Sequence, residues 1–576
     1  MDFLLRRSKH LLNWKSVKLG NYFLYYHQNN AVERRELLLG NENYLIIGDV
    51  NISFANTIRY GISKETILNN IEKLTNGYII IYDKILDTIS IYNDIFGFYH
   101  LFCIHNDNDI IVSSDFKFLL NSASRKIDNY ALFDILLFNY TLFDRTLIKD
   151  IRRLMGGSEL IIRENDCYLN VKYNFAEKYI LPDRLHYLSP NDLGDILVGN
   201  ISKELDKQLD IQLTMTGGFD SRALLAACSN MGLNFSTFTF GQKGNIEIET
   251  TKPFINKYSK EHKIFELDNK FINNLPGILK EFIEVNKDNP TILDLPQYSF
   301  IKNQLPSLNI ITGFMGGEIM AGQSVGAQVT FTDFAAEMIK AQNVNDLSGL
   351  FDYKISITNI FNPEQINEIK DNYLNTLKPY FHQCHNLNLL RFLINEKYSK
   401  FFGTVNKVFK NHSNLIIPFM NVDYLRMLLS SEFSFLKKPP FKQNPLRNLK
   451  YKISYAKMIK YLKPELGTTK FDRLYKLNDL TNVCRLPIAG MGYVNSHVLK
   501  INKKYYPRPH HYDLWYENIM FDEFKDINFN AISGLLREDF SFVSIDYKNL
   551  PDGDKKIWSN LLGFKLATDM ILKAKF

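Results

Sequence analysis

The stretch from Ile211 to Arg222 constrains the fold of this chain more than any other part of its sequence. Its residues, IQLTMTGGFDSR, begin as an apolar strand, continue through two adjacent glycines and enter a helical pattern rich in alanine and leucine. Because glycine has no side chain, backbone N–H groups can approach an anion closely there, and a helix N-terminus adds unpaired donors and a favourable dipole. The stretch therefore predicts a strand–turn–helix unit that binds phosphate.

Hydroxyl and carboxylate side chains accompany the two glycines. Thr216 and Ser221 can donate hydrogen bonds to phosphate oxygens, and Asp220 can hold a Mg²⁺ ion that bridges those oxygens. An ordinary strand-to-helix turn, with Asp or Ser as a cap, is the better interpretation of two glycines alone, but the complete run favours a nucleotide site. The predicted nucleotide-binding residues are Leu213, Thr216, Gly217, Gly218, Asp220 and Ser221.

The run from Thr216 to Ser221 resembles the pyrophosphate loop Ser-Gly-Gly-x-Asp-Ser of the asparagine synthetase family, with Thr216 at the first serine. It lacks the Gly-Lys-Ser/Thr ending of a Walker loop. The resemblance implies ATP and Mg²⁺, cleavage between the α- and β-phosphates, and an acyl-adenylate that an amine then attacks. The implied partners are a small-molecule or peptide carboxylate and an amine donor.

A second glycine-rich turn, Thr312 to Glu318, follows another apolar strand. At this place the resembled family carries Ser-Gly-x-Gly-Ala/Gly-Asp-Glu, whose Asp helps to bind magnesium pyrophosphate, and the register puts Gly317 at that Asp. Mg²⁺ is often held by one or two carboxylates, with phosphates and water completing its shell. The predicted metal ligands are therefore Asp220 and Glu318, although a purely structural Glu318 stays open, and Gly313 joins the predicted ATP site.

The loop is followed by a strand, residues 235–241, and by a helix from about Glu247 to Tyr258. Strand, helix, strand and helix at this spacing predict a doubly wound parallel sheet with its ligand at the carboxyl ends of the strands. The resemblance implies that Phe240 lies beside the adenine. Glu247 occupies a place where the family often has an acid, and a capping role in the helix is the favoured interpretation.

The N-terminal part, residues 1–180, shows short β-branched runs separated by turns, which predict a sheet-rich domain. The segments 93–97, 113–115 and 151–157 resemble landmarks of the glutamine amidotransferase domain of asparagine synthetases, an α+β sandwich of the N-terminal-nucleophile hydrolase type. Such chemistry needs a cysteine at the mature N-terminus. Position 2 is Asp2 and the first cysteine is Cys103, so we expect the fold without release of ammonia from glutamine.

The chain of 576 residues is too long for one core, and a Pro-punctuated segment, residues 181–190, separates the two predicted domains. The second, residues 191–576, is an α/β synthetase domain with a helical C-terminal extension. Five scattered cysteines indicate a reducing, cytoplasmic location, and no segment is apolar enough to predict a membrane span. A net charge of +7 argues against a dedicated nucleic-acid binder. The oligomeric state stays open.

Lysines crowd residues 437–463, and the resemblance implies that one of them stabilises charge at the reacting centre. The candidates are Lys442, Lys450, Lys452, Lys457 and Lys460, but for each a solvated helix face is favoured, and no catalytic residue is assigned. Residues 382–385, His-Gln-Cys-His, lack a second ligand pair, which argues against a metal cluster.

The sequence therefore predicts an ATP-dependent ligase that forms an amide bond. The alternatives are an inactive scaffold, which Gly317 and Asp2 motivate, and an ordinary asparagine synthetase that uses free ammonia. An adenylase that modifies RNA is a further alternative, and the amidotransferase-like N-terminal part argues against it.

Overall fold

The structure is a computed structural model. It describes residues 1–7, 14–28, 35–61, 63–106, 109–163, 166–171, 188–292, 295–321, 341, 343–349, 351, 362–381, 390–431, 445–472, 475–495, 515 and 552–573. The predicted boundary at residues 181–190 falls largely outside these ranges and stays a prediction. Within them, no helix combines the length and the apolar character needed to cross a lipid bilayer.

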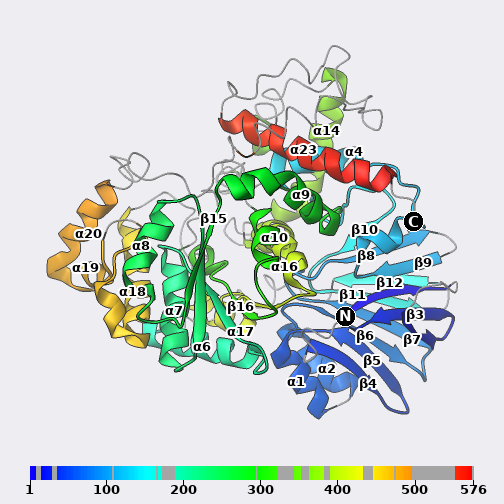
Figure 1. The fold of residues 1–576 in the computed structure, drawn as a ribbon. Coiled ribbons are helices and arrows are strands. Elements are labelled where there is room, and N and C mark those ends of the chain that lie inside the picture. The colour runs from blue at the N-terminus through cyan, green and yellow to red at the C-terminus, as the bar shows by residue number, and fades with distance from the viewer. Residues whose placement is uncertain are drawn as a thin grey trace.

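Two six-stranded antiparallel sheets form the N-terminal sandwich (Figure 1). One sheet has the order β10-β8-β9-β1-β3-β2, with bounds β1 Asp2–Arg6, β2 Lys15–Leu19, β3 Tyr22–His27, β8 Leu101–Asn106, β9 Asp109–Ser113 and β10 Arg152–Leu154. The other has the order β12-β11-β7-β6-β5-β4, with bounds β4 Glu36–Gly40, β5 Tyr44–Asp49, β6 Tyr78–Asp83, β7 Thr88–Asn93, β11 Ser158–Arg163 and β12 Asp166–Val171. The predicted sheet-rich N-terminal part is confirmed.

Alternating side chains on the strands give the sandwich its layers. In β6, Ile80 joins the core between the sheets, whereas Ile79 and Ile81 join a second core under α1 (Ile52–Tyr60) and α2 (Lys64–Asn70). In β1, Leu4 instead joins the core that contains α3 (Phe116–Leu119) and α4 (Asn129–Phe138). Because successive residues of a strand point to opposite faces, helices cover both outer surfaces of the sandwich.

A five-stranded parallel sheet forms the centre of the second half of the chain. Its order is β15-β14-β13-β16-β17, with bounds β13 Ile211–Thr214, β14 Phe235–Gly241, β15 His262–Glu266, β16 Asn309–Ile311 and β17 Asn414–Ile416. All four strand pairs are parallel. The chain runs outward from β13 to β15 and then returns to β16 on the other side of β13, so the strand order reverses between β13 and β16. Ligands of such sheets bind at this switch point, beyond the carboxyl ends of the strands.

Helices cover both faces of the parallel sheet. Ile311 packs in one core with α6 (Pro190–Glu204), α7 (Phe219–Asn230) and α18 (Pro445–Leu462). Its neighbour Ile310 packs in another core with α9 (Asn269–Val285), α10 (Gln297–Lys302) and α16 (Gly403–Phe409). This arrangement confirms the predicted doubly wound parallel sheet.

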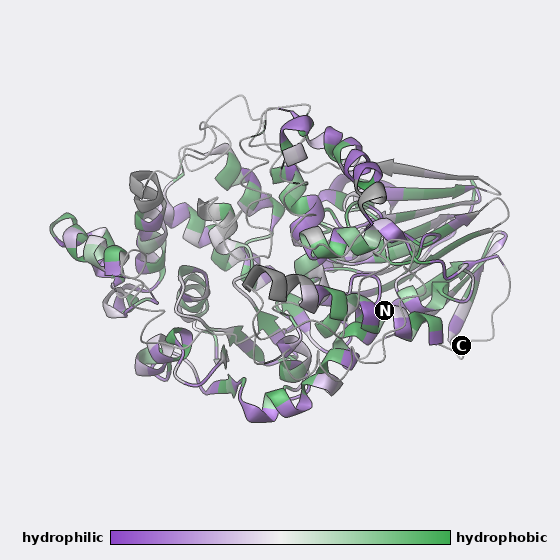
Figure 2. Cartoon of the chain, turned by 90° about the horizontal axis from the view of Figure 1, so that it is seen from above, coloured by the Kyte–Doolittle hydropathy of each residue, from purple (hydrophilic) through white to green (hydrophobic). Residues whose placement is uncertain are grey.

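The remaining described helices surround these layers. Their bounds are α8 Ile246–Ile255, α11 Gly316–Ala321, α14 Pro363–Leu377, the π-helix η5 Leu393–Phe402, α17 Val422–Ser430, α19 Leu477–Thr481, α20 Leu486–Tyr493 and α23 Asp552–Lys573, and the short 3₁₀ helices are η2 Ile71–Lys73, η3 Val344–Leu347, η4 Lys378–Phe381, η7 Pro464–Thr468 and η8 Val483–Arg485. Figure 2 shows hydrophilic and hydrophobic residues alternating along many of these helices, as expected for helices that pack on one side.

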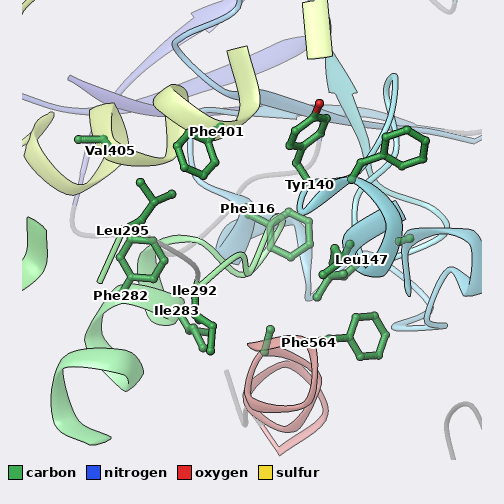
Figure 3. Close-up of a cluster of buried hydrophobic side chains, with 14 of the residues drawn as sticks. Phe116, Tyr140, Leu147, Phe282, Ile283, Ile292, Leu295, Phe401, Val405 and Phe564 are labelled. Atoms are coloured by element: carbon green, nitrogen blue, oxygen red, sulfur yellow. The ribbon is translucent and has the colours of Figure 1, made fainter. Parts of the chain in front are cut away.

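One apolar core joins the two halves of the molecule. It contains Phe116 and Leu147 from the N-terminal sandwich, Phe282 from α9 and Phe564 from α23 (Figure 3). The helix α23, which belongs to the predicted helical C-terminal extension, lies against α4 and α9. The C-terminal end of the described chain therefore packs onto the N-terminal sandwich.

Candidate functional site

The predicted nucleotide loop lies at the carboxyl end of β13, directly before α7. Gly218 is the N-cap of α7, and no side chain caps this helix. The Gly218 N–H donates to Thr216 Oγ1 at 3.2 Å, the Thr216 N–H donates to Ser221 Oγ at 3.1 Å, and the Ser221 hydroxyl donates to the Thr216 carbonyl at 3.1 Å. The two hydroxyls that we expected to face phosphate therefore also hold the loop in its closed shape.

The space that a side chain at position 217 would occupy is already filled by neighbouring atoms. A Cβ at this position would lie 2.5 Å from Thr250 Oγ1 and 2.8 Å from Asp472 Cβ, so no larger residue fits. Its carbonyl accepts a hydrogen bond of 3.1 Å from the Asp472 N–H, and its own N–H donates to the Glu247 carboxylate. Glu247 lies in the first turn of α8, but Asn245 is the N-cap of that helix. The contact of Glu247 with the loop is therefore a role beyond the predicted helix capping.

The second glycine-rich turn lies against Asp220. Cβ atoms at Gly316 and Gly317 would lie 2.7 Å from Asp220 Oδ1 and 3.3 Å from Asp220 Oδ2. A Cβ at Gly313 would lie 3.0 Å from Asp220 Cβ and 3.2 Å from the Ser221 nitrogen. The carboxyl ends of β13 and β16 thus bring the two predicted turns together, and glycines at the second turn leave the Asp220 carboxylate room for a ligand.

We expect the Gly316→Ala substitution to lower the free energy of unfolding by about 1–3 kcal/mol, because its methyl group would overlap Asp220 Oδ1 and the ring of Phe419. The control is Gly277→Ala in α9, where an added Cβ meets no atom within 4 Å and alanine favours the helix. Urea denaturation of both variants checks this prediction. Equal stabilities for the two variants would contradict the close approach of the turns.

A tyrosine from α18 holds the Asp220 carboxylate. The Tyr455 hydroxyl donates to Asp220 Oδ1 at 2.8 Å. Burial and then the charge of Asp220 raise the pKa of Tyr424 in α17, which is a second phenol on this side of the site. Tyr455 lies among the lysines of residues 437–463, and no local pattern in the sequence marks it as a site residue.

Residues 469–472, which we call the strap, cross the start of α7. Phe471 of the strap stacks on Phe219 with their ring centroids 4.3 Å apart, and Phe219 also stacks on Tyr455 at 5.6 Å. Phe471 is anchored by its N–H, which donates to the Tyr475 carbonyl at 2.8 Å. The aromatic residue inside the loop is therefore clamped between the strap and α18.

Arg222 ties the strap to α7. Its guanidinium is fully buried between the rings of Phe254 and Phe471, 4.7 and 4.3 Å from their centroids. It donates to Thr469 Oγ1 and to the Lys470 carbonyl. Burial lowers the pKa of Arg222 to about 10, although the nearby acids oppose this shift. Arg222 stays a cation at neutral pH and fixes the strap over the loop.

The other predicted ATP residues lie near this edge of the sheet. Leu213 is buried in β13, where its backbone pairs with Thr237 and Ile311, so it builds the strand that carries the loop. Phe240 is half-buried near the end of β14, and its ring lies edge-on to Tyr298 with centroids 5.6 Å apart. An adenine contact by either residue stays a prediction.

The structure describes the side chain of only one of the two predicted metal ligands. Asp220 lies in the loop, whereas the Glu318 side chain lies outside the described residues, although its backbone lies in α11. Among the described side chains, no group of three or more His, Cys, Asp or Glu is arranged to hold a metal ion. Asp220 and the glycine space beside it still fit a Mg²⁺ ion that takes most of its ligands from phosphate and water.

The structure also describes the side chains of only some of the candidate lysines. Lys457 is exposed on α18, and Lys460 donates to Thr481 Oγ1 at 3.0 Å. Lys452 is half-buried, whereas Lys442 and the side chain of Lys450 lie outside the described residues. The segment 382–385, which was considered as a metal cluster, also lies outside them. The structure therefore assigns none of these lysines to the reacting centre.

The start of β1 carries no thiol. Asp2 Oδ1 accepts hydrogen bonds from Ser114 Oγ at 3.0 Å and from Lys410 Nζ at 2.7 Å, and Asp2 Oδ2 accepts one from Asn411 at 3.0 Å. Although burial opposes the shift, Lys410 holds the pKa of Asp2 well below its usual value. Cys103 lies in β8, which β9 separates from β1, and it pairs with Val112 of β9. Asp2 therefore serves as an anchor between β1 and the residues that follow α16.

Two solved structures show limited similarity to this chain. The first, the allosteric regulatory enzyme of purine biosynthesis, is 12% identical over 43% of this chain and 67% of its own, with a TM-score of 0.18. The second is a glutamine phosphoribosylpyrophosphate amidotransferase from B. subtilis complexed with ADP and GMP, 9% identical over 55% of this chain and 65% of its own, with a TM-score of 0.17. Scores this low support no argument about fold or function.

The family comparison concerns the N-terminal sandwich. No curated relative matches the chain. The model of the glutamine amidotransferase domain family matches residues 35–174, which is less than half of the 576 residues. These residues include β4 to β12 and the helices between them. The N-terminal sandwich is therefore a glutamine amidotransferase-like domain.

Proposed function

We propose that this protein is an ATP-dependent ligase that adenylates a carboxylate and joins it to an amine, as asparagine synthetase-like enzymes do. The observation that carries the proposal is the position of the 216–221 loop at the switch point of the parallel sheet, with the uncapped α7 behind it and Asp220 facing the glycine turn of β16. Backbone donors, a helix dipole and one carboxylate suit magnesium pyrophosphate.

The contact of Glu247 with the Gly217 N–H supports the same proposal. A carboxylate of the chain itself is bound at the loop, just before the N-terminus of α7, where donors and dipole favour a negative charge. The loop thus has the properties of an anion site. A phosphate oxygen is a chemically similar acceptor for the same N–H group.

The reaction would proceed in two displacements. A carboxylate oxygen of the substrate attacks the α-phosphorus of ATP, the bond from that phosphorus to the bridging oxygen breaks, and pyrophosphate leaves with the electron pair. An amine nitrogen then attacks the acyl carbon, the bond from that carbon to the AMP oxygen breaks, and the amine loses a proton. The loop amides and α7 would hold the pyrophosphate. Asp220, oriented by Tyr455, would hold a Mg²⁺ ion that neutralises the negative charge of the pyrophosphate.

The nitrogen would come from a free amine or ammonia. The first strand of the amidotransferase-like domain begins with Asp2, whose side chain does not carry the nucleophilic thiol that glutamine hydrolysis by this type of domain requires. We propose that this domain has a structural role. Its buried contacts with the parallel-sheet region support that role, among them the paired amides of Asn76 and Asn406, 3.0–3.1 Å apart.

The proposal is tested by exchange of labelled pyrophosphate into ATP, driven by a panel of carboxylates without any amine. A productive carboxylate is expected to give exchange, and addition of its amine partner is expected to give AMP and an amide. Glutamine is expected not to replace the amine or ammonia. Exchange that requires no carboxylate, or formation of ADP in place of AMP, would contradict the proposal.

A binding or scaffold protein without catalysis is the second candidate. Gly317, which leaves Asp220 without a neighbouring carboxylate at that position, favours it. Absence of both ATP binding and pyrophosphate exchange would support this candidate over the ligase.

A further inference from the structure

We propose that the Glu247 carboxylate is an internal occupant of the nucleotide loop, which a phosphate group of the incoming nucleotide must displace. This inference rests on the proposed function, because it concerns how the same loop is regulated. It assigns Glu247 a role as a gate that sets the affinity for nucleotide, in addition to its place in the first turn of α8.

The contacts of the loop carry the inference. The three amides that begin it are all engaged within the chain: Thr216 N with Ser221 Oγ, Gly217 N with the Glu247 carboxylate, and Gly218 N with Thr216 Oγ1. The first and third bonds are local and shape the loop. The second comes from another helix, and its acceptor is an anion that stands where a phosphate oxygen would be bound.

The backbone around Glu247 is held by hydrogen bonds within α8 and its N-cap, and the inference needs only the side chain of Glu247 to move. The Asn245 side chain accepts hydrogen bonds from the N–H groups of Glu247 at 2.8 Å and Ile248 at 3.2 Å. The Thr251 hydroxyl donates to the Glu247 carbonyl at 2.9 Å. A change of side-chain rotamer therefore frees the Gly217 N–H and leaves these bonds intact.

Electrostatics make the displacement costly for the nucleotide. Two anions that compete for one donor repel one another at short range, and the repulsion weakens as ionic strength rises. The nearby cation Arg222 is held by the strap and by two aromatic rings; burial lowers its pKa, and the charges of Asp472 and Glu247 oppose this shift. Removing the negative charge of Glu247 while keeping a hydrogen-bond acceptor should therefore strengthen nucleotide binding and leave the loop formed.

The experiment compares the full chain with its Glu247→Gln and Glu249→Gln variants. Glu249 lies on the same helix, is half-buried and pairs with Lys252 at 3.2 Å, so its variant controls for the loss of one negative charge from α8. Calorimetry measures the Kd of inorganic pyrophosphate and of ATP, each with Mg²⁺ and with a chelator, at low and high ionic strength. Thermal unfolding checks that all three proteins are folded.

We expect Glu247→Gln to bind both ligands about tenfold more tightly at low ionic strength, with a smaller gain at high ionic strength. Glu249→Gln is expected to match the unsubstituted chain. Equal or weaker binding by Glu247→Gln would overturn the inference, and weaker binding only in Mg²⁺ would make Glu247 a metal ligand instead. Failure of all three folded proteins to bind either ligand would overturn the proposed function itself.

Discussion

Asp220→Asn is expected to lower pyrophosphate release at least about a hundredfold while the protein stays folded. Asparagine has the shape of aspartate and can still accept the hydrogen bond that Tyr455 donates at 2.8 Å. It lacks the negative charge that would hold Mg²⁺ beside the phosphates. The loss should therefore fall on catalysis, which the pyrophosphate exchange assay measures, and the unfolding transition should hardly change.

The control for this prediction is Asp371→Asn. Asp371 is exposed on α14, away from the nucleotide loop, so its variant should keep the full exchange rate. Exchange that survives in Asp220→Asn would show that the metal is held elsewhere. A variant that loses exchange only because it unfolds would appear in the thermal transition, and Tyr455→Phe would then serve as a milder change at the same carboxylate.

Asp288→Asn is expected to lower the free energy of unfolding by about 3–5 kcal/mol, because it leaves buried cations without their anion. Asp288 is fully buried. Its Oδ2 accepts a hydrogen bond from Arg153 Nη2 at 2.8 Å and lies 3.3 Å from His100 Nδ1, and its Oδ1 accepts one from Lys407. Arg153 and His100 belong to the N-terminal sandwich, whereas Lys407 belongs to α16. The carboxylate therefore joins the two halves of the molecule.

Urea denaturation measures this effect, and Asp371→Asn again serves as a control, with an expected change within about 0.5 kcal/mol. Burial alone would raise the pKa of Asp288, but Lys407, His100 and Arg153 hold it well below its usual value. Its stabilising contribution is therefore complete above the ordinary carboxyl range and is lost as the pH falls, so the difference between the unsubstituted chain and Asp288→Asn should shrink in acid. A loss below about 1 kcal/mol near neutral pH would contradict this role.

Local patterns predicted the elements of the site well. The loop from Thr216 to Ser221 and the turn from Thr312 to Gly317 each follow a strand, and parallel strands end at one edge of a sheet, so their meeting at Asp220 could be foreseen. The same reasoning predicted the doubly wound sheet. The alternation of apolar residues in the N-terminal part predicted its strands, because each strand has two different faces.

Contacts between segments far apart in the sequence could not be predicted in this way. Tyr455 and the strap reach the loop across more than two hundred residues, and neither has a pattern of its own. A run of lysines is a visible pattern in a sequence, whereas the single Tyr455 among them is not. Arg222, by contrast, lies in an ordinary helical pattern, and only its packing between Phe254 and Phe471 shows its role.

A crystal structure with a non-hydrolysable ATP analogue and Mg²⁺ would show whether the 216–221 loop binds the phosphates of the nucleotide. We expect the β- and γ-phosphates at the 216–221 loop, with the Gly217 N–H donating to a phosphate oxygen, the Glu247 carboxylate turned away and the metal ion on Asp220. Nucleotide bound at another place, or a loop still filled by Glu247 when nucleotide is bound, would contradict it.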